Sequence, residues 1–414
     1  MARRMETHRV SNTKFQEYLP IYEGDRYCLM CGQACPVRRV TKNEATSPHG
    51  WALLVASVNR GLLSWNEETV DVLYQCADCG NCQGNCATDR PLPYALMAAR
   101  AQVVELGQTP AIVRLLDQNL RAWGNPFGQV TNDPSTALRA GSRTTEERTA
   151  SVVRLDASSH TLPVRRNRRD DVSPSSVALF IGDGAHFMRP QTIGAAEKLL
   201  RAVGMTPNLV RVGYSSGYLP YTLGLWDTAR KLAQELVDEL QNNMPSLLVT
   251  LSAQDAHTFK HVYSELGVTL PDTLNSTTLV DYLAQASMEE RLTWRPRSSQ
   301  PYTYHDATQS IRLTGYALHA RVLATTVMGG APRKMVFREN LATSVGNSGG
   351  LAFTQPMLAE NMARMRIREA KETGAEILLT DDPMDTTTLE KYADGIQVLN
   401  LFEVMAEQVV ESKQ

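Results

Sequence analysis

The sequence Cys76-Ala-Asp-Cys79-Gly-Asn-Cys82-Gln-Gly-Asn-Cys86 has the spacing C-x2-C-x2-C-x3-C. A chain with this spacing can wrap a cubane iron–sulfur cluster. The first three thiolates bind three irons of one cube, and the fourth normally binds the other cluster in two-cluster proteins. The motif therefore predicts that residues 76–86 form a cluster-binding loop within a cysteine-bearing N-terminal region.

A second cysteine group, Cys28-Leu-Met-Cys31-Gly-Gln-Ala-Cys35-Pro36, matches the last three cysteines of the same pattern and the proline that follows them. Asp25 stands where the first cysteine is expected. Because the fourth cysteine of each group crosses to the other cluster, we expect two ligand sets. Cys35, Cys76, Cys79 and Cys82 hold a complete [4Fe–4S] cluster, and Cys28, Cys31 and Cys86 hold a second cluster with three thiolates.

The three-thiolate site has three interpretations. It holds a [4Fe–4S] cluster whose fourth iron is bound by Asp25 or water, a [3Fe–4S] cluster, or no cluster. A carboxylate is a poorer ligand than a thiolate for iron in a sulfide cluster, so this site should be labile. For the whole constellation, the alternatives are zinc bound by C-x2-C pairs or seven inert buried thiols. The C-x2-C-x2-C-x3-C spacing is unusual for zinc.

Composition narrows the class of protein. The chain has 414 residues, of which 43% are hydrophobic and 21% charged, with a net charge of -2. These values exclude a low-hydropathy disordered chain and a strongly basic nucleic-acid binder. All seven cysteines lie between Cys28 and Cys86, and their odd number, without a secretory signal in the sequence, argues against disulfides. No secretory signal or membrane-spanning stretch is evident, so we expect a soluble, cytoplasmic protein.

The order of elements predicts an α+β multidomain chain. Residues 1–124 should be mainly helical, with helices at Gly50–Arg60, Glu67–Tyr74 and Tyr94–Leu106. Residues 125–174 are turn-rich and charged, notably in the arginine-rich run at 165–170, and we expect them to be a solvated linker.

The remaining residues alternate apolar runs with amphipathic helices, as βαβ units do, and contain an internal repeat. Its two copies define predicted α/β domains at 175–298 and 299–414. Three landmarks recur in the same order. They are a turn into a strand at 204–210 and 330–336, a helix at Asp227–Asn242 and Pro356–Thr373, and a strand, turn and helix start at Leu247–Asp255 and Ile377–Asp385.

With these residues the chain resembles the iron–sulfur subunits that fuse a two-cluster helical ferredoxin domain to two CCG domains. Examples are the iron–sulfur subunits of glycolate oxidase and of anaerobic glycerol-3-phosphate dehydrogenase, and the heterodisulfide reductase CB-type subunits. The match includes Ser47-Pro-His-Gly50, which is similar to the family's Pro-Arg-Gly helix start. The resemblance implies a helical ferredoxin domain followed by two CCG-like α/β domains.

The chain departs from the family in these repeats, because every family cysteine is replaced. The replacements are Asp183, Ser215, Ser216, Ser252 and Asp255 in the first repeat and Thr308, Val345, Gly346, Asp382 and Asp385 in the second. Hydroxyls and carboxylates are hard ligands and cannot hold the noncubane clusters of such domains. We therefore expect the scaffold to be kept without its metal chemistry.

The substituted residues have two interpretations. Asp381, Asp382 and Asp385 could gather with His305 and Asp306 at strand carboxyl ends, where α/β proteins bind ligands, and could bind Mg²⁺ or Ca²⁺. The favoured interpretation is that Asp and Ser cap the helices that follow these strands. The glycine-rich sequence at 346–350 could cradle a phosphate, and a tight turn is the favoured interpretation.

Together these features predict an iron–sulfur electron-transfer subunit of a multi-subunit oxidoreductase, with no catalytic residue of its own. It would relay electrons between a flavoprotein dehydrogenase, hydrogenase or heterodisulfide-reductase-like partner and a quinone or other carrier. It would be peripheral at the inner face of the membrane through such partners. The rival is a catalytic or ligand-binding heterodisulfide-reductase-like subunit that uses the aspartates of the repeats. A purely structural role in assembly is the third interpretation.

Overall fold

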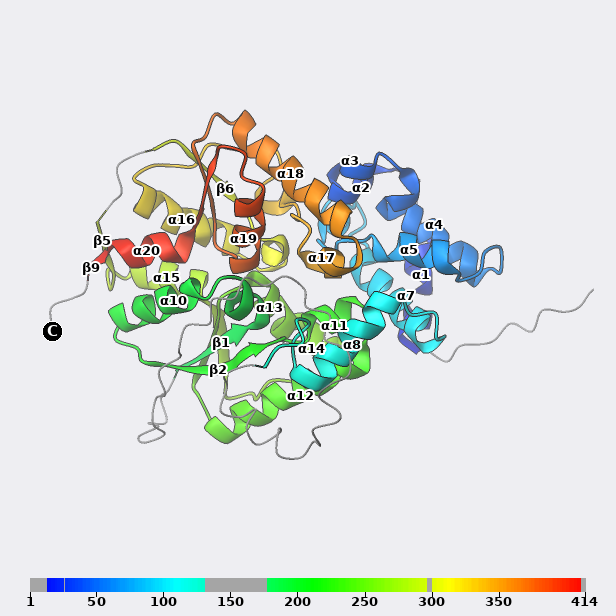
Figure 1. Ribbon diagram of the computed structural model, residues 1–414, viewed down its shortest axis with the longest axis horizontal. Helices are drawn as coiled ribbons and strands as arrows, with labels where there is room; N and C mark the ends of the chain where they lie inside the picture. The colour runs from blue at the N-terminus through cyan, green and yellow to red at the C-terminus, as the bar shows by residue number, and fades with distance from the viewer. Residues whose placement is uncertain (1–12, 26, 131–176, 296–299, 411–414) are drawn as a thin grey trace, which may run out of the picture.

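The computed structural model describes residues 13–25, 27–130, 177–295 and 300–410 (Figure 1). The chain folds into an N-terminal helical part and two units that each contain a parallel sheet. The predicted linker at 125–174 lies outside the described residues from position 131 onward, as does the arginine-rich run at 165–170. The domain boundaries stay a prediction.

The helical part contains eight helices within the described residues. They are α1 (Thr13–Glu23), α2 (Met30–Ala34), α3 (Pro36–Thr41), α4 (Pro48–Asn59), α5 (Glu67–Tyr74), α6 (Asn81–Gly84), α7 (Leu92–Glu105) and α8 (Ala111–Trp123). The three helices predicted in this part are present as α4, α5 and α7. Asn66 and Thr69 form a capping box at the start of α5. Helix α7 is buried along most of its length and packs against α1, α4 and α5.

The first α/β unit is built on four parallel strands in the order β2-β1-β3-β4. The strands are β1 (Val177–Gly182), β2 (Pro207–Tyr214), β3 (Leu247–Thr250) and β4 (Asn275–Thr278). The longer helices of this unit are α10 (Gln191–Ala202), α12 (Trp226–Asn243) and α15 (Leu279–Met288), and the short helices include α11 (Tyr218–Thr222) and α13 (Ala253–His257). All six residues of β1 are buried, as expected for a strand covered on both faces.

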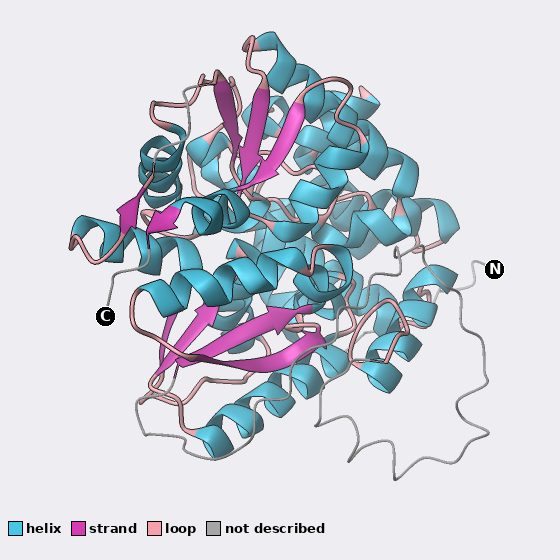
Figure 2. Ribbon diagram, turned by 60° about the vertical axis from the view of Figure 1, so that its left-hand side comes forward, coloured by secondary structure: helices cyan, strands magenta, loops and turns pink. Residues whose placement is uncertain are grey.

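The second α/β unit is built on three parallel strands in the order β6-β7-β8. The strands are β6 (Tyr302–His305), β7 (Ile377–Thr380) and β8 (Gln397–Asn400), and the helices are α16 (Tyr316–Met328), α17 (Leu351–Thr354), α18 (Pro356–Glu372), α19 (Pro383–Lys391) and α20 (Leu401–Gln408). A short antiparallel pair, β5 (Thr293–Trp294) with β9 (Val409–Val410), lies beside them. Figure 2 shows the two parallel sheets as separate groups of strands with helices between them.

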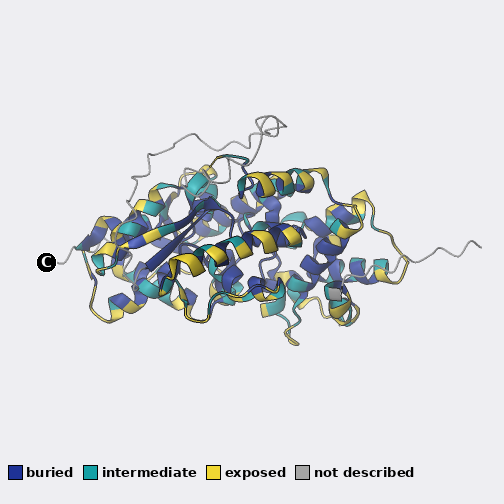
Figure 3. Ribbon diagram, turned by 90° about the horizontal axis from the view of Figure 1, so that it is seen from below, coloured by how far each residue is buried: buried dark blue, intermediate teal, exposed yellow. Residues whose placement is uncertain are grey.

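The three parts share their cores. One apolar cluster joins α1, α4, α5 and α7 of the helical part to α12 and one face of β1. A second cluster joins the other face of β1 and helices α10 and α15 to α16 and α20 of the second unit. Figure 3 shows the buried strands inside and the exposed faces of helices outside. Separating the parts would therefore expose apolar surface, which costs roughly 25 cal/mol per Å².

The structure bears on each landmark of the predicted repeat. The two predicted long helices are α12 and α18, and the two strand–turn–helix landmarks are β3 with α13 and β7 with α19. The first landmark differs: 207–214 forms β2, but 330–336 contributes one isolated bridge between Thr303 and Arg333. The strand predicted there is wrong. Pro332 lacks a backbone N–H, and Val336 is 74% exposed, so this segment does not continue along the sheet.

Among the helices of the described ranges, none combines the length and the apolar character that a bilayer-spanning helix needs.

Candidate metal centre

Four cysteines from separate segments of the helical part line one cavity. Cys35 precedes α3, Cys76 and Cys79 lie in the loop between α5 and α6, and Cys82 lies in α6. They line the cavity together with apolar side chains that include Trp51. These are the four residues that the crossed assignment groups into one complete cluster. Their ligation of iron stays a prediction.

The surroundings of the four thiols fit an iron–sulfur cube. Burial raises the pKa of Cys76 to about 12 and that of Cys79 to about 11, and it raises the pKa of Cys35 further. Each thiol also raises the pKa of its neighbours, so the set is unfavourable as free thiolates. Backbone N–H groups approach the sulfurs, including that of Asp78 at 3.4 Å from Cys76 Sγ. Iron binding deprotonates such thiols, and N–H donors to sulfur are a feature of cluster sites.

A site for one metal ion needs a different arrangement of ligands from a site for a cluster. Across the described residues, no three His, Cys, Asp or Glu side chains converge closely enough to hold one metal ion. A cube spreads its four thiolates over separate iron corners around a shared core, so it needs a lined cavity rather than a point of convergence.

The remaining three cysteines lie together with Asp25. Burial raises the pKa of Cys31 to about 11, and the negative charges of Asp25, Cys28 and Cys86 act in the same direction. Cys28 is exposed, and Cys86 is hydrogen-bonded to Thr88 at 3.3 Å. This group is nearer to solvent than the four-cysteine cavity.

Asp25 is engaged by protein donors. Its Oδ1 accepts from the Tyr27 N–H at 2.9 Å, and its Oδ2 lies 2.8 Å from Nδ1 of His49. His49 belongs to the Pro-His-Gly helix start, where Ser47 caps α4 by accepting from the Gly50 N–H. The sequence motif predicts this helix start, but it does not indicate the contact of His49 with Asp25. Ligation of iron by Asp25 stays a prediction.

The loop between Cys76 and Cys79 is held by residues of both α/β units. Asp78 Oδ2 accepts from the Tyr218 hydroxyl at 2.9 Å, and Asp78 Oδ1 lies 3.0 Å from Nη2 of Arg312. Gln309 donates to the Asp78 carbonyl at 2.8 Å. These partners could not be predicted from the sequence. They lie at least 140 residues from Asp78 along the chain, and no motif near them indicates the contact.

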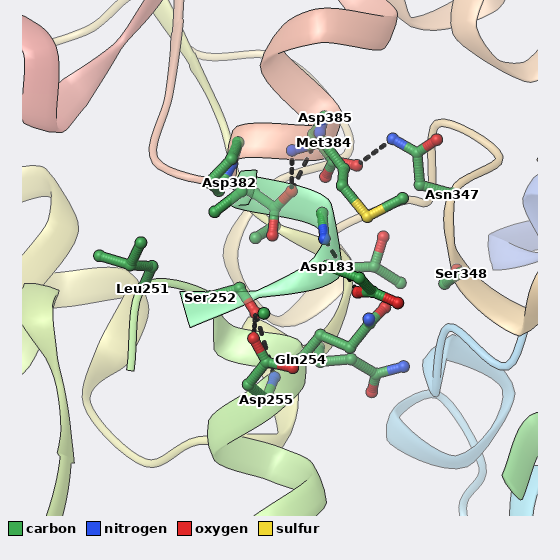
Figure 4. A pocket seen from close by; sticks show the side chains of 17 residues that line it. Asp183, Leu251, Ser252, Gln254, Asp255, Asn347, Ser348, Asp382, Met384 and Asp385 are labelled. Carbon is green, nitrogen blue, oxygen red and sulfur yellow. Dashed lines mark hydrogen bonds between the residues drawn. The ribbon is translucent and has the colours of Figure 1, made fainter. Parts of the chain in front are cut away.

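A second cavity lies at the carboxyl ends of β1, β3, β6 and β7, between the two sheets. Six of the replaced family positions line it: Asp183, Ser252, Asp255, Thr308, Asp382 and Asp385. Figure 4 shows side chains of both units facing one another across this space. Six of the ten replaced positions thus meet at one place, although they come from two repeats.

The polar residues of this cavity cap helices, as the favoured interpretation predicted. Ser252 accepts from the Asp255 N–H at 3.1 Å at the start of α13. Asp382 accepts from the N–H groups of Met384 and Asp385, both at 2.9 Å, at the start of α19 (Figure 4). The capping prediction is confirmed at these two residues.

Burial favours the protonated form of the carboxyl groups in this cavity. It raises the pKa of Asp382 to about 8, and the charge of Asp385 adds to this. Burial also raises the pKa of Asp183 to about 7 and that of Asp385 to about 6. Neighbouring buried carboxyl groups disfavour joint ionisation, so these residues are not a set of free anions at pH 7.

The predicted gathering of five acidic and histidine residues occurs only in part. Asp382 and Asp385 line the cavity, and His305 Nε2 lies 3.1 Å from Asp385 Oδ2 while its Nδ1 accepts from Arg366. Asp306 is paired with Arg321 outside the cavity. Asp381 accepts from the hydroxyls of Tyr304 and Tyr316.

Two further replaced positions, Val345 and Gly346, serve packing. Val345 is fully buried, and Gly346 has φ +99° with Ala359 against it. In the glycine-rich sequence, Gly349 and Gly350 have φ of +67° and +75° and pack against Ala77 and Leu223. The positive φ and close contacts agree with the tight turn predicted for this sequence.

Comparison with curated proteins finds two redox relatives. The chain is 27% identical over 357 residues to a "Probable membrane-anchored ferredoxin" of Chromohalobacter salexigens, covering 84% of this chain and 48% of that protein. It is 26% identical over 186 residues to a subunit of the dihydromethanophenazine:CoB–CoM heterodisulfide reductase of Methanosarcina barkeri, covering 44% of this chain and 45% of that protein. The chain thus spans about half the length of the curated relatives it matches.

No protein-family model matches the chain. Among solved structures, an aspartate racemase homologue from Pyrococcus horikoshii OT3 matches with a TM-score of 0.26 and 12% identity, covering 56% of this chain and 96% of that chain. A putative Asp/Glu racemase from Yersinia pestis matches with a TM-score of 0.27 and 13% identity over the same shares. TM-scores this low do not establish a shared fold. The sequence relatives support the resemblance to iron–sulfur redox subunits.

Proposed function

We propose that the chain is an iron–sulfur electron-transfer subunit of a multi-subunit oxidoreductase. The observation that carries this proposal is the cavity lined by Cys35, Cys76, Cys79 and Cys82. Its four sulfurs would hold a [4Fe–4S] cluster, which supplies one-electron redox chemistry. The residues around it exclude water and orient N–H groups toward sulfur.

The three-cysteine group would hold a second cluster, [4Fe–4S] or [3Fe–4S], with Asp25 or water beside it. The charge of Cys31 acts on Cys82, which supports close placement of the two sites. Cys28 is exposed, and it is flanked by exposed Tyr27, Leu29 and Met30. Electrons would therefore enter or leave at this site and pass to the enclosed four-cysteine site.

The two α/β units would serve as CCG-like scaffolds that dock partner subunits. They retain strand, turn and helix landmarks while ten family cysteines are replaced. Candidate partners are a flavoprotein dehydrogenase, a hydrogenase or a heterodisulfide-reductase-like subunit, together with a quinone-reactive subunit. The name of the heterodisulfide reductase relative supports membership of a multi-subunit redox complex.

Iron and acid-labile sulfide analysis after anaerobic purification tests the proposal. We expect about four irons from the complete site and three or four more from the second site, with matching sulfide. Dithionite should bleach the visible absorption and produce a paramagnetic signal. Stoichiometric zinc without sulfide would contradict the proposal.

A second candidate function is favoured by the position of the second cavity between the sheets, since α/β proteins bind ligands at strand carboxyl ends. In this case the chain is a catalytic or ligand-binding heterodisulfide-reductase-like subunit that uses Asp382 and Asp385. Mass spectrometry of small molecules released from the native complex tests it. A stoichiometric compound that an Asp385→Asn variant loses would support this candidate, and its absence from the native complex would contradict it.

A further inference from the structure

Arg100 is a fully buried cation in the middle of α7 that has no carboxylate partner within the described part of the chain. Its guanidinium donates only to backbone carbonyls and one sulfur. The carbonyl acceptors are Leu73 at 3.0 Å, Cys76 at 2.8 Å, Thr222 at 2.8 Å and Gly349 at 3.0 Å. The ring of Tyr74 lies 4.8 Å from the guanidinium carbon.

Other buried arginines of the described ranges are paired. Arg189 contacts Glu390 and Glu403, Arg211 contacts Glu235, and Arg366 contacts Glu369. Taking an arginine out of water is costly unless hydrogen bonds and an opposite charge compensate. The carbonyl dipoles satisfy the donors of Arg100, but they do not neutralise its charge.

The position of Arg100 identifies where the opposite charge would lie. The guanidinium binds the carbonyl of Cys76, a residue of the four-cysteine cavity. A cluster bound by four thiolates carries net negative charge, and net charge is one of the factors that set cluster potentials.

We propose that Arg100 is the buried counter-charge of the cluster held by Cys35, Cys76, Cys79 and Cys82, and that it raises the reduction potential of this cluster. Reduction adds one negative charge to the cluster, so a fixed cation beside it stabilises the reduced form more than the oxidised form. Arg100 is a positioning and tuning residue rather than a ligand. This inference rests on the proposed four-cysteine cluster.

Two of the carbonyl groups that accept from Arg100 belong to the α/β units. Thr222 belongs to the first α/β unit and Gly349 to the second, so one side chain binds the cluster loop and both units. Arg100 therefore lies beside the proposed cluster and also holds the three parts of the fold together through its hydrogen bonds. Loss of its charge and loss of its hydrogen bonds are separable by substitution, because lysine keeps the charge without the planar fork of donors.

The test is an anaerobic redox titration of the full-length protein, followed by electron paramagnetic resonance. The variants are Arg100→Gln and Arg100→Lys, with Arg189→Gln as the matched control. The control also removes a buried arginine, but the carboxylates that it pairs with lie away from the cysteines. For Arg100→Gln we expect the reduction equilibrium to fall at least tenfold, which is about 59 mV for one electron. Arg100→Lys and Arg189→Gln should stay close to wild type.

The outcomes are distinguishable. A cluster lost from Arg100→Gln but retained in Arg100→Lys also supports the counter-charge role. A wild-type potential in Arg100→Gln overturns it, and so does loss of the cluster from both Arg100 variants while the control keeps it. Absence of a cluster from the wild-type protein itself refutes the proposed function instead.

Discussion

Asp78 and Arg312 form a buried ion pair, with Oδ1 and Nη2 3.0 Å apart, between the four-cysteine loop and the second α/β unit. The same carboxylate accepts from the Tyr218 hydroxyl of the first unit. Asp78 lies between Cys76 and Cys79 and has φ +47°, a conformation that few non-glycine residues adopt. The shape of the cysteine loop thus depends on contacts with both α/β units.

Replacing Arg312 should destabilise the fold and the cysteine loop together. Arg312→Met leaves the Asp78 carboxylate buried without its partner, which costs about 3–5 kcal/mol in comparable buried pairs. Denaturant unfolding measures the loss, and iron content measures retention of the cluster. Lys371→Met is the control, because its pair with Asp394 is exposed. Equal stability of the two variants would contradict a structural role for the buried pair.

A methyl group at Gly349 should separate the glycine-rich turn from the cysteine loop. A Cβ there would lie 2.6 Å from the Cys76 carbonyl oxygen and 2.7 Å from the Ala77 carbonyl carbon. The matched control is Gly267→Ala, with φ +70° against +67° and open space around the added methyl. The control should cost about 1–2 kcal/mol for its backbone conformation alone.

Thermal unfolding and iron content distinguish these two glycine variants. Gly349→Ala should be less stable than Gly267→Ala and should lose iron more readily. The same melting temperature and iron content in both would show that the turn does not support the cysteine loop.

The sequence predicted the residues of the cysteine cavity because ligand spacing is a local property of the chain. The crossed grouping places Cys35 with Cys76, Cys79 and Cys82, and these four line one cavity. The helices α4, α5 and α7 were predictable because caps and apolar periodicity are also local.

The missed features depend on packing between distant segments. Asp78 meets Tyr218 and Arg312, and Arg100 meets Thr222, across more than 100 positions of chain, and nothing near them in the sequence marks these contacts. The strand expected at 330–336 shortens to a bridge at Arg333, although the apolar pattern resembles that of β2. The meeting of replaced cysteine positions in one cavity required the relative placement of both sheets.

The acidic cavity should make the protein more stable at mildly acidic pH. The pKa of Asp382 is raised to about 8 in the folded chain, above its unfolded value near 3.9. Between about pH 4 and pH 8, Asp382 therefore holds a proton in the folded state that it loses in the unfolded state. The contribution of Asp382 to the free energy of unfolding is fully present below the unfolded pKa. It is lost as the pH rises through the folded pKa.

Asp382→Asn tests this dependence, because asparagine keeps the capping acceptor without ionising. The unfolding free energy of the variant should exceed that of the wild type by more at pH 8.5 than at pH 5, because the wild type loses stability across this range. Asp227→Asn, at an exposed position, should show no such difference between the two pH values. A variant of Asp382 that is less stable at pH 8.5 than wild type would refute the protonated state of this cavity.

We propose that Cys35 binds the same cluster as Cys76, Cys79 and Cys82, and that Cys28, Cys31 and Cys86 bind the second cluster. Electron paramagnetic resonance of the dithionite-reduced Cys35→Ala, Cys79→Ala and Cys31→Ala variants tests it most directly. We expect Cys35→Ala and Cys79→Ala to perturb the same signal, and Cys31→Ala to leave that signal unchanged and to alter the other one. Matching spectra of Cys35→Ala and Cys31→Ala, with Cys79→Ala different, would contradict it.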